Sequence, residues 1–166
     1  MGEAREARRL RDAAGRCAAG GLAAGLRVMK QAARTLTVQT PGQGLHEITR
    51  EVAAFVADEG MATGLLTLFC RHTSASLLIQ ENADPDVRRD LEDWVAKLAP
   101  ESPSYRHQDE GPDDMPAHLR TALTTVQLSV PVVGGRLALG TWQGIYLFEH
   151  RTRPHRREVV LHLLGS

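Results

Sequence analysis

The chain has little cysteine, no excess charge of either sign and no long hydrophobic run. Its 166 residues include two cysteines, Cys17 in a polar segment and Cys70 in an apolar run. Two cysteines in such different surroundings argue against a fold held together by disulfide bonds. We expect Cys70 to be a small buried hydrophobic residue.

Charge and hydrophobicity exclude further classes of protein. The 20 lysine and arginine residues balance the 20 aspartate and glutamate residues, so the formal net charge is zero. Because a neutral chain creates no overall field that attracts polyanions, we expect neither nucleic acid nor a membrane as a partner. No segment approaches the roughly 18 consecutive apolar residues that span a bilayer, and the N-terminal residues do not form a secretory signal. We therefore expect a cytoplasmic protein.

The length and the 42% hydrophobic content suit one domain with a real core. Residues 1–28 differ from the rest, because arginine and alanine dominate them and almost no large apolar residue precedes Leu10. Such a segment cannot bury a face that offsets its ordering entropy. We interpret residues 1–28 as a flexible or helical extension and place the domain at residues 29–166. A start of translation at Met29 is an alternative.

Hydrophobic periodicity predicts the first helix and the central strand. Apolar residues recur at helical spacing from Ile48 to Val56, and Gly60 follows as a stop. Residues 64–71 form a short apolar run, which predicts a strand that is buried on both faces and carries His72 at its end. Alternation of apolar residues and turn signals predicts further strands at residues 35–38, 76–80, 126–130, 137–148 and 157–163.

Two more helices are predicted between the strands. Asp84 and Pro85 form an N-cap followed by proline at the first helical position, which predicts a helix that ends before Pro100. Asp114 is the expected N-cap of the next helix, with three residues facing inward: Leu119, Ala122 and Leu123. The fold class is therefore α+β, with helices packed on a sheet that is largely antiparallel.

Segments 105–118 and 140–149 gather imidazole, carboxylate and amide groups beside glycine and proline. Because buried polar groups need partners, such a concentration points to a site for a metal, an anion or a polar ligand. We predict His72, His107 and His118 as metal ligands, since three protein ligands leave a position open for water or substrate. The alternative is that His107 is a surface residue and His72 is hydrogen-bonded at the end of a strand.

Other features of these segments leave alternatives open. The start of the third helix could bind an anion, unless Asp113 and Asp114 already cap it. Trp142 suits the core or a subunit contact better than a ligand platform. Serines follow His72, but no Gly-x-Ser-x-Gly elbow is present, which disfavours a Ser-His enzyme. The basic run at residues 151–157 is interpreted as a solvated turn, from which one arginine could reach an anion.

Several motifs occur together in one order: His72-Thr-Ser-Ala, Glu81-Asn-Ala-Asp-Pro85, Tyr105 with His107, Asp113-Asp-Met-Pro-Ala-His118, Gly140-Thr-Trp-Gln143, and Glu149 followed by Arg157. This series resembles the YjbQ-like family of secondary thiamine-phosphate synthases over about residues 30–163. The resemblance implies an α+β homotrimer with a polar cleft that holds histidines and often a metal ion. It also implies a transferase activity that joins hydroxymethylpyrimidine diphosphate to thiazole phosphate.

The resemblance also places individual residues at the family's motif positions, and from these positions we infer their roles. We expect a divalent metal ion, zinc or magnesium, on His72, His107 and His118, and a small phosphorylated metabolite as substrate. We expect substrate contacts from three residues: Asn82, Gln143 and Arg157. Asp114 and Glu149 are the expected catalytic carboxylates, which orient a ligand histidine or accept a proton. The alternatives are a non-catalytic trimer that binds a metal or a phosphometabolite, and a metal-dependent hydrolase.

Overall fold

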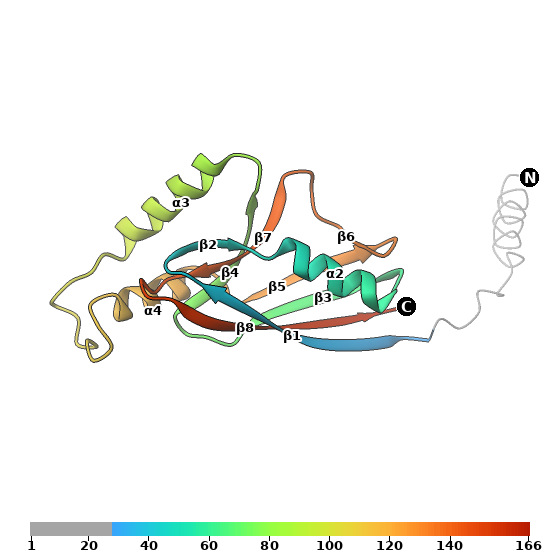
Figure 1. Cartoon of the computed structure of the whole chain (residues 1–166), viewed down its shortest axis with the longest axis horizontal. Coiled ribbons are helices and arrows are strands. Elements are labelled where there is room, and N and C mark those ends of the chain that lie inside the picture. Colours follow the sequence, from blue (N-terminus) through green and yellow to red (C-terminus); the bar gives the residue numbers. More distant parts are fainter. Residues whose placement is uncertain (1–27) are drawn as a thin grey trace, which may run out of the picture.

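The computed structural model describes residues 28–166 and has two antiparallel sheets with three helices (Figure 1). The predicted extension at residues 1–28 lies outside the described residues, except for Val28. The elements in chain order are β1 (Lys30–Thr40), β2 (Gly44–Glu47), α2 (Thr49–Glu59), β3 (Thr63–Cys70), β4 (Ala75–Glu81), α3 (Pro85–Leu98), α4 (Asp114–Leu123), β5 (Gln127–Val133), β6 (Arg136–Leu137), β7 (Gln143–Glu149) and β8 (His155–Gly165).

The larger sheet has the strand order β1-β8-β3-β5-β6, and the smaller has the order β2-β7-β4. Every strand pair in both sheets is antiparallel. Strands β1 and β8 pair along their full lengths, from Lys30 with Gly165 to Thr40 with His155. The predicted α+β class with a largely antiparallel sheet is therefore confirmed.

Alternation along β3 directs one set of side chains into the core and the other set outward. Leu66 and Leu68 are fully buried, and they belong to the core cluster that also contains Phe55 of α2. Their neighbours Leu65 and Phe69 are 46% and 44% exposed. The prediction that this strand is buried on both faces is therefore wrong within residues 28–166, where no helix or strand covers its outer face.

Cys70, the last residue of β3, lies in the core as predicted. Its thiol donates a hydrogen bond to the carbonyl oxygen of Ala75 at 3.4 Å. Burial raises the pKa of the thiol. It is therefore a structural residue rather than a reactive one, since the thiolate is the nucleophilic form.

The predicted limits of the first two helices are confirmed. α2 ends at Gly60, whose φ of 64° lies in the left-handed region that favours glycine. α3 begins at Pro85, and the Asp84 side chain accepts a hydrogen bond from the Asp86 amide at 2.8 Å. In the part of the chain that the structure describes, no helix combines the length and apolar character needed to cross a membrane.

The buried face of α4 differs from the prediction. Helix α4 starts at Asp114, with Asp113 in the N-cap position. Leu123 is 61% exposed, while Asp114 and Arg120 are buried. The prediction failed because polar contacts orient this helix: the Arg120 guanidinium donates two hydrogen bonds, of 2.9 and 3.2 Å, to the carbonyl oxygen of Ala99.

The long strand predicted at residues 137–148 is also wrong. The chain leaves the larger sheet after β6 and enters the smaller sheet at β7, so the two parts belong to different sheets. The Gly140 amide donates to Oε1 of Gln143 at 2.8 Å within the connecting turn. Glycine at 140 thus marks a change of sheet, where the sequence pattern suggested a bulge.

Helices α3 and α4 lie at one end of the molecule, together with the loop 99–113 that connects them (Figure 1). Helix α2 packs between the two sheets, with contacts to β1, β6 and β7. The loop and the first turns of α4 carry His107, Asp114 and His118. The fold therefore brings three of the predicted site residues to one end of the domain.

Replacing Asp84 with alanine is expected to lower the free energy of unfolding by about 1 kcal/mol, because the Asp86 amide loses its acceptor. Urea unfolding followed by circular dichroism measures this change. Asp90→Ala is the matched control, since Asp90 is exposed on the same helix. Equal losses in the two variants would show that the cap does not stabilise α3.

Candidate metal centre

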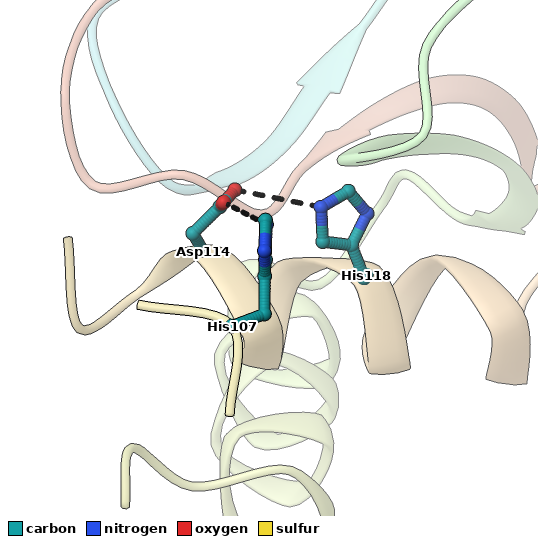
Figure 2. Close-up of side chains that lie close together, drawn as sticks. All are labelled: His107, Asp114 and His118. Carbon is teal, nitrogen blue, oxygen red and sulfur yellow. Dashed lines mark ion pairs between the residues drawn. The ribbon is translucent and has the colours of Figure 1, made fainter. Parts of the chain in front are cut away.

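Figure 2 shows three side chains that point toward one another: His107, Asp114 and His118. Asp114 and His118 are four residues apart on α4 and therefore share one face of the helix. His107 reaches them from the preceding loop. Their ligand atoms all lie within 4.8 Å of one another, and among residues 28–166 no other group of three or more such side chains has this geometry.

The hydrogen bonding of His118 prepares one ring nitrogen for a cation. Its Nδ1 lies 3.0 Å from the carbonyl oxygen of Thr73. A carbonyl oxygen only accepts, so Nδ1 carries the hydrogen, and in the neutral ring Nε2 has a free lone pair. This Nε2 lies 3.6 Å from Oδ1 of Asp114. A ring lone pair beside a carboxylate favours a cation between the two groups, and a hydrogen bond from the second ring nitrogen is typical of metal-binding histidines.

Asp114 supplies the second argument for a cation. Its side chain is 3% exposed, and Oδ2 is buried without a hydrogen-bond partner. The Nε2 atom of His107 lies 2.7 Å from Oδ2, but the approach lacks the geometry of a hydrogen bond. A buried carboxylate oxygen without a donor is unfavourable. Two imidazoles and one carboxylate form a donor set known from catalytic zinc sites, so the residues fit a divalent ion.

Arg151 fixes the start of α4 through three carboxylates. Its guanidinium lies 3.0 Å from Asp113, 2.5 Å from Asp114 and 3.2 Å from Glu110. Burial alone would raise the pKa of Asp113, but hydrogen bonds from the Thr152 amide and from Arg151 lower it to about 2. The start of this helix is thus occupied by the chain's own ion pairs, which disfavours the alternative of an anion site there.

His72 is not part of this cluster. Its Nε2 accepts a hydrogen bond from the backbone amide of Glu158 at 2.8 Å, so the lone pair of that nitrogen is already used. Burial, and then the charge of Arg157, lower the pKa of His72, which keeps the ring neutral. The position of His72 therefore agrees with the alternative interpretation, in which this histidine is hydrogen-bonded at the end of a strand.

Glu149 and Arg157 form a buried ion pair. Glu149 is 0% exposed, and Arg157 donates to its two oxygens at 2.7 and 2.5 Å. The hydroxyl of Thr40 and the amide of Arg151 add hydrogen bonds of 2.8 and 3.0 Å. Burial alone would raise the pKa of Glu149, but these donors, Arg157 first, lower it. The interpretation of residues 151–157 as a solvated turn is wrong for Arg151 and Arg157, which are both buried.

Asn82 and Gln143 lie at the other end of the smaller sheet. Gln143 pairs with Glu81 at one end of β7, while Glu149 pairs with Ala75 at the other end. Gln143 and Glu149 are six positions apart along β7, which corresponds to about 20 Å. The neighbouring Trp142 is 66% exposed, so it does not belong to the core of the chain. The structure therefore divides the predicted site residues into two groups.

A Ser-His contact exists, but it is buried. Ser76 Oγ lies 2.9 Å from Nε2 of His150, and both residues are fully buried. Burial, and then the charge of Arg120, lower the pKa of His150 to about 3. The ring of His150 packs on Phe148 with 4.4 Å between ring centroids. This pair has no access to a substrate, and it belongs to the interior of the domain.

Comparison with known proteins places residues 34–166 within a family model described as "UPF0047 protein YjbQ-like". A UPF0047 protein of Synechocystis sp. is 54% identical over 138 residues, which cover 82% of this chain and 94% of that protein. The UPF0047 protein YjbQ of Salmonella typhimurium is 44% identical, with coverages of 80% and 97%.

Two solved structures are also similar to this chain. A YbjQ-like protein of unknown function from Sulfolobus solfataricus has a TM-score of 0.77 and 26% identity, covering 84% of this chain and 100% of its own. A conserved hypothetical protein from Thermus thermophilus has a TM-score of 0.69 and 43% identity, with coverages of 77% and 97%.

Proposed function

Because the chain belongs to the UPF0047 YjbQ-like family, we propose that it is a metal-dependent transferase of the thiamine-phosphate synthase type. The observation that carries this proposal is the group of His107, Asp114 and His118, whose ligand atoms lie within 4.8 Å of one another and in which Oδ2 of the buried Asp114 receives no hydrogen bond. The type of reaction rests on the motif resemblance, since the names of the relatives specify no reaction.

The ligand atoms would be Nε2 of His107, Oδ2 of Asp114 and Nε2 of His118. Two imidazoles favour zinc over magnesium, which prefers oxygen ligands and retains several waters. A bound divalent ion would stabilise the negative charge that develops on a departing diphosphate. Arg151 and Arg157 are both engaged by carboxylates, so neither guanidinium is free for a phosphate. The positive charge for substrate binding would therefore come mainly from the ion.

The proposed reaction has a simple balance. The ring nitrogen of the thiazole forms a bond to the pyrimidine methylene carbon, and the bond from that carbon to the diphosphate oxygen breaks. The diphosphate leaves with the electron pair, no proton is transferred and nothing is oxidised. Such a reaction needs no general base. The buried Glu149 is thus assigned a positioning role through Arg157 and the Arg151 amide, in place of proton transfer.

A further proposal is the homotrimer that the resemblance implies. Leu65 and Leu164 lie opposite each other on the outer face of the larger sheet and are 46% and 43% exposed. Exposed apolar patches of this kind mark interaction surfaces.

The oligomeric state can be measured by light scattering after gel filtration. Three chains of 18.2 kDa give an expected mass of about 55 kDa. The variant carrying Leu65→Ser and Leu164→Ser is expected to elute as a single chain, since it loses the apolar face. A monomeric wild-type protein would contradict the proposal.

The proposed function is tested by incubating zinc-loaded protein with the two substrates and measuring thiamine phosphate. We expect the variant with His107→Ala and His118→Ala to lose at least about 100-fold in rate, because two ligands are removed. His46→Ala is the control, since His46 lies in β2 and outside the cluster.

The other outcomes separate the alternatives. Bound metal with hydrolysis of phosphate esters, and no thiamine phosphate, would favour the hydrolase. Bound metal without any turnover would favour the non-catalytic binding protein. Product formation that is unchanged in the double variant would remove the metal from the mechanism.

A further inference from the structure

The candidate metal centre lies between two hollows of different character. His118 lines one hollow and His107 lines the other. The centroids of these two rings are only 5.4 Å apart. Groups that extend from the two hollows toward the histidines would therefore meet at the centre.

The hollow beside His118 is mainly apolar. It has a volume of about 670 Å³ and is formed by the end of β3 and by α4, with Phe69, Ala122 and Val126 in its wall. Arg71 also lines this hollow; its guanidinium lies 3.4 Å from Glu158 in a surface ion pair, which a phosphate would have to displace. An apolar wall with one cation suits a small apolar ring that carries a phosphate.

The hollow beside His107 is smaller, at about 380 Å³, and is the more polar of the two. The loop 99–113 forms it, with the carboxylate of Glu101, the hydroxyl groups of Ser102 and Tyr105, and the amide of Gln108. Hydrogen bonds from the Gln108 side chain to the carbonyl oxygens of Pro103 and Tyr105 hold this loop in shape. The carboxylate of Glu101 can accept hydrogen bonds from an amino-substituted ring, while the diphosphate of that substrate would lie at the ion.

We propose that these hollows are two separate substrate subsites, with the apolar ring that carries a phosphate beside His118 and the amino-substituted pyrimidine beside His107. This inference rests on the proposed function, and it deepens that function by assigning each substrate to one of the two hollows. Both volumes lie within the range of small-molecule pockets. Two subsites on either side of one centre suit the joining of two molecules better than hydrolysis, which needs one subsite and water.

Binding is measured by calorimetry on zinc-loaded protein, with thiazole phosphate and hydroxymethylpyrimidine monophosphate as probes. The monophosphate replaces the diphosphate so that turnover does not disturb the titration. Ala122→Trp fills the apolar hollow from an exposed helix position, and Glu101→Trp fills the polar one from an exposed loop position. Metal content is measured on each variant, so that a loss of the ion is recognised.

Each variant is expected to weaken its own probe at least about 10-fold and to leave the other within about 2-fold. Saturation of the wild-type protein with one probe is expected to leave the affinity for the other unchanged. Competition between the probes, equal weakening of both by either variant, or no binding of either probe would overturn the assignment. Independent binding without thiamine-phosphate formation would keep the two subsites and refute the reaction, so the two failures are distinguishable.

Discussion

Replacing Asp114 with asparagine is expected to reduce the affinity for zinc by at least about 100-fold, beyond the usual effect of losing an outer-shell partner. The substitution removes the charge of the one carboxylate among the three candidate ligands. It also replaces one oxygen by an amide group, which donates hydrogens and does not bind a cation. Equilibrium dialysis followed by elemental analysis measures the change, from about one ion per chain to almost none.

Asp109→Asn is the matched control, because Asp109 is exposed in the loop just before α4 and its replacement removes the same charge. Folding should survive in Asp114→Asn, since Arg151 retains its contacts with Asp113 and Glu110. Circular dichroism verifies this point. Full zinc content in Asp114→Asn would remove this carboxylate from the centre, and loss of zinc in both variants would reduce its role to general charge.

Replacing Glu149 with alanine is expected to lower the free energy of unfolding by about 3–5 kcal/mol, because it leaves Arg157 buried without its counter-charge. The loss includes the hydrogen bonds from Thr40 and from the Arg151 amide. Chemical denaturation followed by fluorescence of the two tryptophans measures the change. A loss below about 1 kcal/mol, the size expected for a surface ion pair, would contradict a buried role for this pair.

The double variant with Glu149→Leu and Arg157→Met distinguishes the cost of an unpaired buried charge from the cost of altered packing. Replacing both charges with apolar side chains leaves no unpaired charge, so its loss should be well below that of Glu149→Ala. This variant also keeps the experiment informative if Glu149→Ala does not fold. Losses that are equal in both variants would show that packing, rather than the unpaired arginine, determines the cost.

Features that depend on neighbouring residues could be predicted from the sequence. The cap at Asp84 and the stop at Gly60 follow from backbone preferences that act within a few residues. The α+β class followed from periodicity. The orientation of α4 could not be predicted, because it depends on the contact between Arg120 and Ala99, 21 residues earlier. Likewise, nothing local shows that the chain changes sheets at Gly140.

The candidate site could be predicted only in part, because residue type is visible in the sequence and contacts between distant residues are not. His107 and His118 were chosen as metal ligands by residue type, and the structure brings them together. Asp114 was expected to assist them, and its position beside both rings makes it a candidate ligand itself. Arg151 was missed as a site residue, because an arginine within a basic run gives no signal that it is buried against three carboxylates. His72 lies outside the cluster of His107, Asp114 and His118, because its ring accepts a hydrogen bond from an amide of β8 that is 86 residues away in the sequence.

The ion pairs of Arg151 determine the formal charge of the side chains around the candidate metal centre. Glu110, Asp113 and Asp114 carry three negative charges around one guanidinium, which leaves a formal charge of minus two. The two histidines add nothing while they are neutral. A divalent ion would bring the group to zero, whereas a monovalent ion would leave a surplus of negative charge beside a buried carboxylate. The formal charge of these side chains is therefore balanced by a divalent cation, whichever metal it is.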